Sequence, residues 1–320
     1  MKRTFFSILA CSALLASCTS LSKVSSEQEH DITFVVAADL HFDHLPESDQ
    51  FCHVVAMNRL EKHFVWPDKS LFAGDSIKKL SSVIIAGDIF DKPLPEIIEL
   101  FKVRYLAGKG DRSLNYICYP GYGNHDINPF SKDSVMNMKG RENALALMDS
   151  IIYTRYMNRK IDAYDPSSRN YSWTDQGVHF LNLQTFGGDT AYCTSSFDWL
   201  ERNLSQNASD GKPVVVVQHY GFDHWAREWW PSESRERLFD ILEPYNVKAI
   251  FVGHTHESSV QEHRGVKIYQ VNNAWPDQSG KASFCVARLK NNNMSMVNCQ
   301  WTDSLGTFEL TDPILNIVSE

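Results

Sequence analysis

The sequence predicts a layered α/β fold, and two features of the chain indicate it. Several apolar runs have the length of β-strands, and helical patterns lie between many of them. The strand-length runs are continuously apolar rather than alternating, which is typical of strands that are buried on both faces. Strands that alternate with helices favour sheets whose faces are covered by helices.

The predicted elements follow one another without an internal repeat. The strand-length runs are residues 32–38, 82–86, 115–119, 178–183, 213–218, 248–252 and 266–271. The helical patterns are residues 49–64, 95–108, 140–160, 197–205 and 232–243. In the last of these, Leu238, Ile241 and Leu242 form an apolar stripe along one helix face.

A C-terminal β-hairpin is expected where two apolar runs flank three consecutive asparagines. A three-residue loop would pair Lys290 with Met294 and place Cys285 opposite Cys299. This register allows either a cross-strand disulfide or two buried free thiols. The remaining cysteines outside the N-terminal segment are expected in the core: Cys52, Cys118 and Cys193.

The N-terminal segment has the features of an export signal rather than of a folded element. Two basic residues precede an apolar core at 5–16, which is too short to span a bilayer comfortably. The core ends in L-A-S-C, which resembles a bacterial lipobox, where cleavage leaves a lipid-modified Cys18. The alternative is an ordinary signal peptide with a chance cysteine. We expect a lipoprotein-type signal peptide over 1–18, a flexible tether over 19–30 and one domain over 31–320.

This leader implies an exported bacterial protein that a lipid anchor attaches to the cell envelope, on its periplasmic or outer-surface face. The lipid is the only membrane attachment expected, and the sequence leaves the leaflet and the oligomeric state open. The formal charge is −8 and no run of Lys or Arg occurs, which argues against binding to nucleic-acid polymers. A hydrophobic content of 43% in 320 residues is enough for a sizeable core.

Five of the predicted strands end in side chains that commonly bind metal ions. These residues are Asp39 and His41, Asp88, Asn124 (followed by His125 and Asp126), His219, and His254 and His256. Sites in α/β proteins are built from the loops beyond the carboxyl ends of strands. The set contains imidazoles, carboxylates and one amide but no thiolate, which suits Mn, Fe or Zn.

Each of these segments has an ordinary explanation when it is taken alone. A single D-x-H has little meaning, a histidine after a strand is commonly a core residue, and Asn, Asp and Gly are turn formers. Chance would have to place all five at the ends of successive apolar runs. The set therefore favours a metal site.

Taken in order, the segments D-L-H, G-D-I-F-D, G-N-H-D, Q-H and G-H-T-H resemble the motifs of the calcineurin-like metallophosphoesterase family. The resemblance extends from about residue 32 to 275. It implies a four-layer α/β/β/α sandwich of two mixed sheets flanked by helices. It also implies a metal-dependent phosphoesterase that uses two divalent metal ions and a dimetal-activated hydroxide, and the leader adds the expectation that this enzyme is exported.

The resemblance also implies a role for each motif residue. One metal would be held by Asp39, His41, Asp88 and His256. The other metal would be held by Asp88, Asn124, His219 and His254. Asp88 bridges the two because a carboxylate has two oxygens. His125 would protonate the leaving oxygen, and Asp126 would orient His125 through a hydrogen bond. Purple acid phosphatases carry a tyrosine at the position of Asp91, so their iron–tyrosinate charge transfer is not expected here.

Substrate-binding residues are expected in the aromatic-rich segment that follows His219. Trp225 and Arg227 would contact a substrate ring and a phosphate oxygen, respectively. The alternative is that the rings of this segment pack it onto the body of the protein. His44 and Tyr122 are further candidates at the border of the cleft.

The sequence leaves the choice between a phosphate monoester and a diester open. The nearest alternative is a phosphodiesterase specific for a glycerophosphodiester or a nucleotide. An alternative of a different class is a metal-binding scaffold without turnover, although every motif position is filled. In either enzymatic case the partner is a small-molecule or lipid-head-group phosphate ester.

Overall fold

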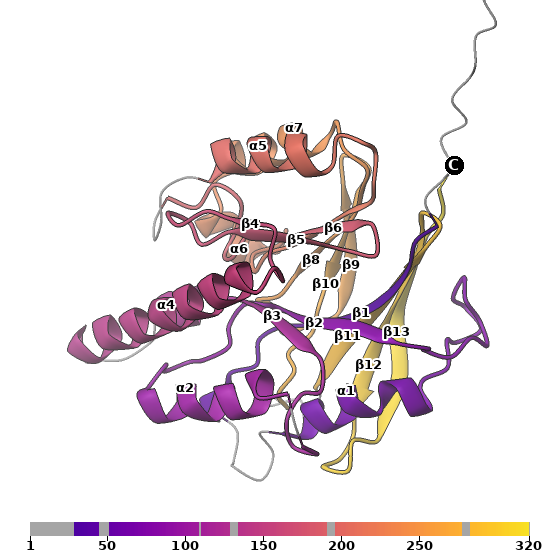
Figure 1. Cartoon of the computed structure of the whole chain (residues 1–320), viewed down its shortest axis with the longest axis horizontal. Helices are drawn as coiled ribbons and strands as arrows, with labels where there is room; N and C mark the ends of the chain where they lie inside the picture. Colours follow the sequence, from indigo (N-terminus) through magenta and orange to yellow (C-terminus); the bar gives the residue numbers. More distant parts are fainter. Residues whose placement is uncertain are drawn as a thin grey trace, which may run out of the picture.

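Two mixed β-sheets pack face to face in the computed structural model, and helices cover both outer faces (Figure 1). The structure describes residues 29–44, 51–108, 110–128, 134–190, 196–276 and 282–319. From top to bottom, Figure 1 shows helices, the seven-stranded sheet, the six-stranded sheet and further helices. The predicted four-layer α/β/β/α sandwich is confirmed.

One sheet contains the first three strands of the chain and the last three. Its order is β13-β12-β11-β1-β2-β3. The strands are β1 (Asp31–Ala37), β2 (Leu80–Ala86), β3 (Ile117–Gly121), β11 (Ser283–Lys290), β12 (Asn293–Trp301) and β13 (Phe308–Ile317). β1, β2 and β3 are parallel, and β11 joins β1 antiparallel.

The other sheet has the order β4-β5-β6-β7-β8-β10-β9. Its strands are β4 (Ala163–Tyr164), β5 (Tyr171–Asp175), β6 (Val178–Asn182), β7 (Val214–Val217), β8 (Val247–Val252), β9 (Ser259–His263) and β10 (Val266–Gln270). β6, β7, β8 and β10 are parallel neighbours. β4, β5 and β9 of this sheet and β13 of the other sheet were not predicted: β4 has only two residues, and β9 is partly exposed and mostly polar.

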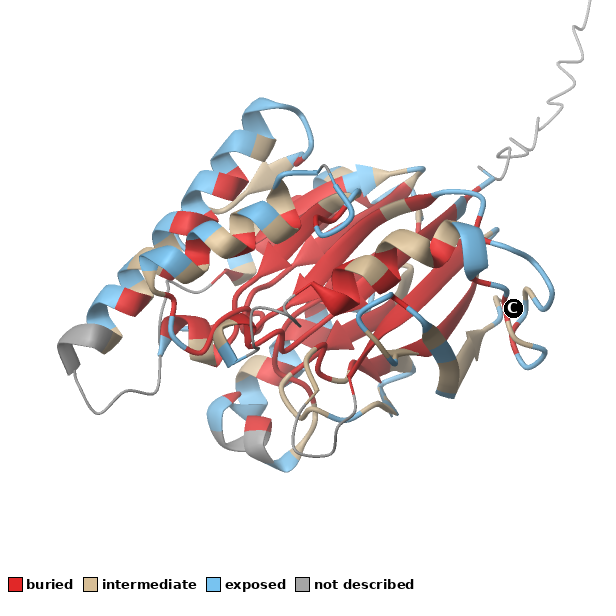
Figure 2. Cartoon of the chain, turned by 90° about the horizontal axis from the view of Figure 1, so that it is seen from below, coloured by how far each residue is buried: buried red, intermediate tan, exposed pale blue. Residues whose placement is uncertain are grey.

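Three hydrophobic clusters hold these layers together. The cluster between the sheets includes Phe34, Phe180 and Phe251, whose rings meet edge to face. A second cluster lies on the outer face of the six-stranded sheet and is covered by α1 (Cys52–His63), α2 (Pro95–Phe101, continued by the π-helix η2, Lys102–Leu106) and α4 (Ser134–Met157). The third cluster lies on the outer face of the seven-stranded sheet and is covered by α5 (Phe197–Asn207), α6 (His224–Trp229) and α7 (Ser232–Leu242). Figure 2 shows the buried residues concentrated in the strands and on the inner faces of the helices.

The C-terminal hairpin is present, but its register differs from the prediction. Lys290 pairs with Asn293, so the loop has two residues, Asn291 and Asn292, with φ of 47° and 65°. Left-handed conformations at both positions give a type I′ turn, the preferred two-residue hairpin loop.

The change in loop length shifts the cysteines by one position. Cys285 faces Asn298, and Cys299 faces Phe284. Both cysteines are free and buried, so the disulfide alternative is wrong and the free-thiol alternative is confirmed. Cys52 and Cys118 are also free and buried, as expected, and Cys193 lies outside the described residues.

The parallel strands of both sheets end on the same side of the molecule. Ala38 forms a bridge with Asn273, which links the ends of β1 and β10 across the two sheets. The predicted signal peptide with Cys18 and nearly all of the predicted tether lie outside the described residues. None of the described helices contains an apolar stretch long enough to span a bilayer.

Candidate dimetal centre

The loops after the strands hold several motif residues in an unusual backbone conformation. The residues with positive φ are Asp39 (49°), His41 (38°), Asp88 (51°), His254 (84°) and His256 (57°). Residues other than glycine rarely adopt this left-handed region, and such strain persists only where the surrounding structure enforces it. The conformation brings side chains from distant parts of the sequence toward one point.

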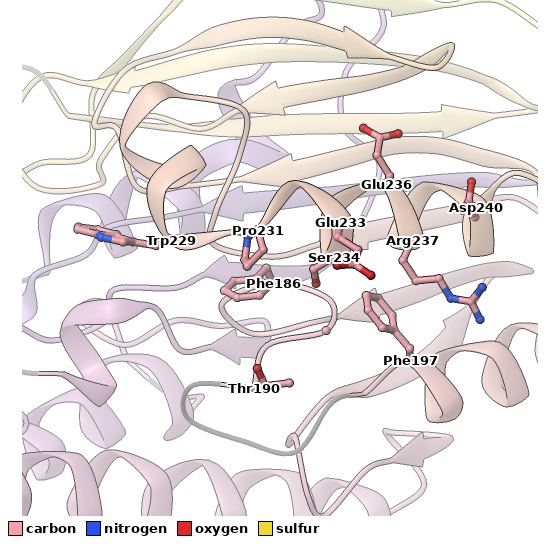
Figure 3. Close-up of a pocket in the computed structure, with 11 residues that line it drawn as sticks. Phe186, Thr190, Phe197, Trp229, Pro231, Glu233, Ser234, Glu236, Arg237 and Asp240 are labelled. Carbon is pink, nitrogen blue, oxygen red and sulfur yellow. The ribbon is translucent and has the colours of Figure 1, made fainter.

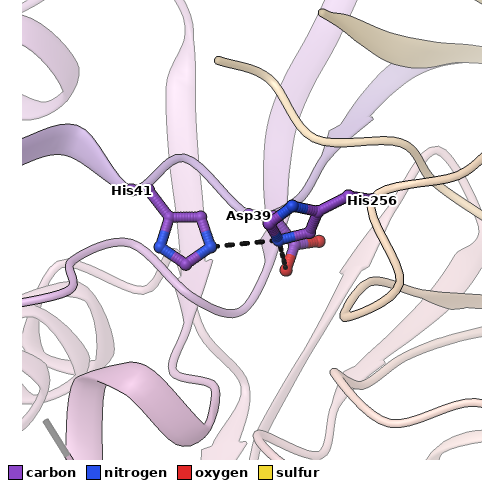
Figure 4. Close-up of side chains that lie close together, drawn as sticks. All are labelled: Asp39, His41 and His256. Carbon is purple, nitrogen blue, oxygen red and sulfur yellow. Dashed lines mark hydrogen bonds and ion pairs between the residues drawn. The ribbon is translucent and has the colours of Figure 1, made fainter. Parts of the chain in front are cut away.

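Asp39, His41 and His256 form the first group, in which the ligand atoms lie within 4.8 Å of one another. Nε2 of His256 lies 3.1 Å from Nε2 of His41 and 3.5 Å from Oδ1 of Asp39 (Figure 4). The backbone N–H of His254 donates to both oxygens of Asp39, at 3.1 and 2.8 Å, and fixes this carboxylate. Two imidazole nitrogens and a carboxylate that converge in this way suit a shared cation.

Asp88, His219 and His254 form the second group. Nδ1–H of His219 donates to the carbonyl of Ala86 at 2.8 Å, so a neutral ring directs the Nε2 lone pair at Oδ2 of Asp88 and Oδ1 of Asn124. Those distances are 3.1 and 3.0 Å. Three acceptors at this spacing require a proton or a metal ion between them. The buried Nε2 of His254 has no hydrogen-bond partner among the described residues, which also fits a metal ligand.

Glycines allow the backbone to pass close to both carboxylates. A Cβ at Gly123 would lie 2.2 Å from Oδ1 of Asp88, and a Cβ at Gly253 would lie 2.8 Å from Oδ2 of Asp39. A side chain at either position would therefore displace a candidate ligand. This explains the glycine of G-N-H-D and the glycine of G-H-T-H.

The buried site favours an ionised Asp88 and neutral rings of His41 and His254, whereas Asp88 raises the pKa of His219 to about 9 against the effect of burial. Burial opposes ionisation of Asp88, but the nearby histidines, His219 first among them, hold its pKa well below the usual range. Burial lowers the pKa of His41 to about 4, and burial together with the His219 ring lowers the pKa of His254 to about 4. These are the protonation states in which both residue types bind metal ions.

His125 is oriented by Asp91 and not by Asp126, so that prediction is wrong. Nδ1–H of His125 donates to Oδ1 of Asp91, in a short contact. Asp126 instead accepts the backbone N–H groups of Ile89, Phe90 and Gly123, at 3.1, 2.8 and 2.8 Å. The reason is that Asp126 lies in the first turn of the short helix α3 (Asn124–Ile127), where its side chain reaches back to the N-cap residue.

Asp91 binds two histidines, one through each carboxylate oxygen. Nε2–H of His44 donates to Oδ2 of Asp91 at 2.6 Å. Burial would raise the pKa of Asp91, but the hydrogen bonds from His125 and His44 hold it at about 2. Burial would lower the pKa of His125, but Asp91 and Asp88 raise it above its ordinary value. This role of Asp91 was not predicted from the sequence, where the residue stood out only as a departure from purple acid phosphatases.

The four predicted substrate-binding residues fall into three classes. Tyr122 is buried in the core between the sheets and donates its hydroxyl to the carbonyl of Ser168 at 3.1 Å, so its placement at the cleft is wrong. The side chain of His44 is 40% exposed, at the edge of the site. Trp225 and Arg227 belong to α6, but their side chains lie outside the described part of the chain.

Two tryptophans border the site: Trp229 belongs to the aromatic-rich segment in which substrate contacts were expected, whereas Trp275 was not predicted. The ring of Trp275 lies 5.8 Å from that of His41 and 5.5 Å from that of His44. The ring of Trp229 lies 5.7 Å from that of His254. Trp275 follows β10 in the segment N-N-A-W, which matches no ligand motif and gives no signal in the sequence.

Comparisons with known proteins agree with this geometry. The sequence model of the calcineurin-like phosphoesterase family matches residues 32–258, and the chain therefore belongs to that family. All residues of both ligand groups lie within the matched residues. A protein from Psychrobacter arcticus named "Probable cyclic nucleotide phosphodiesterase" is 24% identical over 196 residues, which cover 58% of this chain and 61% of that protein.

Solved structures share the fold at low sequence identity. A dimetal phosphatase from Danio rerio superposes with a TM-score of 0.53 and 11% identity, over 83% of this chain and 95% of that chain. A purple acid phosphatase from yellow lupin (Lupinus luteus) seeds gives a TM-score of 0.56 and 12% identity, over 91% of this chain and 54% of that chain.

Proposed function

We propose that this calcineurin-like phosphoesterase is an exported phosphodiesterase that hydrolyses a nucleotide-type phosphodiester. One observation carries the proposal: two groups of carboxylates and imidazoles lie beside His125, and no described Lys or Arg side chain contacts them. The name of the Psychrobacter relative, a probable cyclic nucleotide phosphodiesterase, supports the choice of substrate class.

The residues of the site fit two divalent ions. We assign one ion to Asp39, His41, Asp88 and His256. We assign the other to Asp88, Asn124, His219 and His254, with Asp88 shared. When they are bound, such ions polarise the phosphate ester and lower the pKa of water. The nitrogen and oxygen donors, without a thiolate, suit Mn, Fe or Zn.

The charges around the site favour a diester over a monoester. A phosphate diester carries one negative charge, whereas a monoester carries close to two at neutral pH. Asp91 adds a carboxylate 3.8 Å from Nδ1 of His41, whereas Asp126 adds less charge because burial and Asp88 raise its pKa to about 7. Among the side chains that the structure describes, no Lys or Arg contacts the candidate ligands or Asp91 to balance a second phosphate charge. A diester therefore needs fewer positive charges from the protein to balance its phosphate group.

His125 is the residue we assign to protonation of the leaving oxygen. Asp91 holds Nδ1, so the imidazole presents Nε2 to the ester, and the ring is 25% exposed. The raised pKa of His125 keeps more of the ring protonated near neutral pH, as a general acid requires. Asp91 acts as the positioning residue.

Hydrolysis of two matched aryl esters tests this proposal. The protein supplied with Mn²⁺ should hydrolyse bis(p-nitrophenyl) phosphate with a higher kcat/KM than p-nitrophenyl phosphate, and a chelator should abolish both activities. A clear preference for the monoester would contradict the diester assignment. Absence of turnover in protein that binds two metal ions would favour a scaffold.

The export proposal has a separate test. The L-A-S-C segment supports cleavage before Cys18 and lipid attachment there. Cells that express the full chain with labelled palmitate should yield a labelled protein in the envelope fraction, and Cys18→Ala should lose the label. An unlabelled protein cleaved at another position would contradict the lipoprotein assignment.

A further inference from the structure

A groove next to the candidate metal centre contains residues that the proposed mechanism does not use. It has a volume of about 700 Å³ and lies between α5, α7 and the loop that follows β6 (Figure 3). This volume is within the range of small-molecule sites. Phe186, Phe197 and Trp229 supply aromatic walls, and Glu233 and Ser234 of α7 lie between the two phenylalanine rings in Figure 3.

Two aromatic contacts connect the groove with the second ligand group. Trp229 lines the groove, is 46% exposed, and places its ring 5.7 Å from the ring of His254. Phe186 also lines the groove and stacks on Tyr220 at 5.6 Å, and the Tyr220 ring lies 4.7 Å from that of His254. A substituent on a phosphate ester held at the centre would therefore extend along these rings.

The walls of the groove are fixed rather than loosely packed. Phe186 is buried against Trp230 as well as Tyr220. Gly188 has a φ of +85°, and a Cβ there would lie 2.3 Å from the ring of Phe197, so only glycine lets the loop approach this ring. Rigid aromatic faces of this kind suit a flat ring system.

The charges of the groove select against a second anionic group. Glu236 and Asp240 are paired with Arg264, at 3.7 and 2.6 Å, and Figure 3 shows Glu236 directed away from the phenylalanine rings. Arg237 is paired with Glu201 of α5. Among the described residues, Glu233 has no ion-pair partner. The groove thus combines aromatic walls with a carboxylate that accepts hydrogen bonds, and it would repel a further phosphate.

We propose that this groove binds the base of a nucleoside phosphodiester, with its ring against Trp229 and Phe197 and its N–H groups donated to Glu233. The inference rests on the proposed phosphodiesterase function and deepens it. Guanine is the most informative base, because its edge carries more than one N–H donor that a carboxylate can accept. Trp229 and Glu233 become specificity-determining residues.

The test compares a cyclic nucleotide with a diester that is too small to fill the groove. We would measure kcat/KM for guanosine 3′,5′-cyclic phosphate and for ethyl p-nitrophenyl phosphate, and take the ratio of the two. Trp229→Ala should lower the ratio by about 10- to 100-fold, the range of base stacking on an aromatic ring. Glu233→Gln should lower it by about 3- to 10-fold. Glu309→Gln, at an exposed position of β13 in the other sheet, is the matched control and should leave the ratio unchanged.

Binding of guanosine, which has no phosphate, separates this inference from the proposed function. We expect guanosine to bind the metal-loaded protein in calorimetry, and Trp229→Ala and Glu233→Gln to weaken that binding by similar factors. If the wild type binds guanosine in this way but hydrolyses neither diester, the assignment of the groove as a base-binding site is supported and the phosphodiesterase proposal is wrong. Unchanged ratios together with no guanosine binding would overturn the groove assignment. A kcat/KM for glycerophosphocholine that exceeds the value for guanosine 3′,5′-cyclic phosphate, and that falls in Glu233→Gln, would contradict the assignment of a base. It would indicate that the groove binds a cationic head group.

Discussion

The two ligand groups of the candidate metal centre are built to different degrees of rigidity. His219 in the second group is fully buried, and the carbonyl of Ala86 fixes its tautomer. His256 in the first group is 29% exposed, and Nδ1 of His41 is buried without a hydrogen-bond partner among the described residues. A hydrogen bond that fixes the second ring nitrogen of a histidine ligand raises its affinity for a metal. The second group should therefore bind its metal more tightly than the first.

The largest effect is expected where the two groups meet. Asp88→Asn removes the carboxylate charge that we assign to both ions, so both metals and all measurable turnover should be lost. Metal content measured by inductively coupled plasma mass spectrometry checks this expectation. A variant that retains two metals per chain would refute the bridging assignment.

The next largest effect separates chemistry from metal binding. His125→Ala should lower kcat by about 10²- to 10⁴-fold because the leaving oxygen loses its proton donor. Metal content should stay at the wild-type level, since His125 belongs to neither ligand set. Unchanged kcat would remove His125 from the mechanism.

Asp91→Asn tests the orientation of His125. Loss of this outer hydrogen bond should lower kcat/KM by about 10- to 100-fold. Asp91 raises the pKa of His125, so its removal should lower that pKa. The protonated acid is then lost at a lower pH, and the alkaline limb of the pH–rate profile should move to lower pH. A limb that stays in place would show that Asp91 has only a structural role.

The smallest effect distinguishes the two ligand groups directly. His256→Ala should lose one metal per chain under dilute conditions and recover part of its activity in excess Mn²⁺. His219→Ala is the matched variant in the rigid group, and excess Mn²⁺ should restore less of its activity. Equal recovery in the two variants would argue against the difference in rigidity.

The predicted ligands that the structure brings together are those whose position depends on strand ends alone. Asp39, Asp88, His219 and His254 each follow a continuously apolar strand, and parallel strands bring such positions to one edge of a sheet. The four-layer arrangement of the two sheets came from the family resemblance, because strand spacing does not state which strands share a sheet.

The errors concern contacts that depend on side-chain direction or on one residue of register. Asp91, in the loop after β2, contacts His125 of α3, which lies 34 positions away in the chain. Asp126 is adjacent to His125, but the helical turn directs it to backbone N–H groups instead. The hairpin register depends on whether Asn293 belongs to the loop or to the strand. A shift of one residue changes the residue that faces Cys285, from Cys299 to Asn298.

The most direct test of the central claim is a metal titration of the metal-free protein. Diester hydrolysis should rise with added Mn²⁺ and reach its plateau at two equivalents per chain, with the tighter equivalent alone giving little turnover. A plateau at one equivalent, with no further gain from the second, would contradict a centre in which both ligand groups act together.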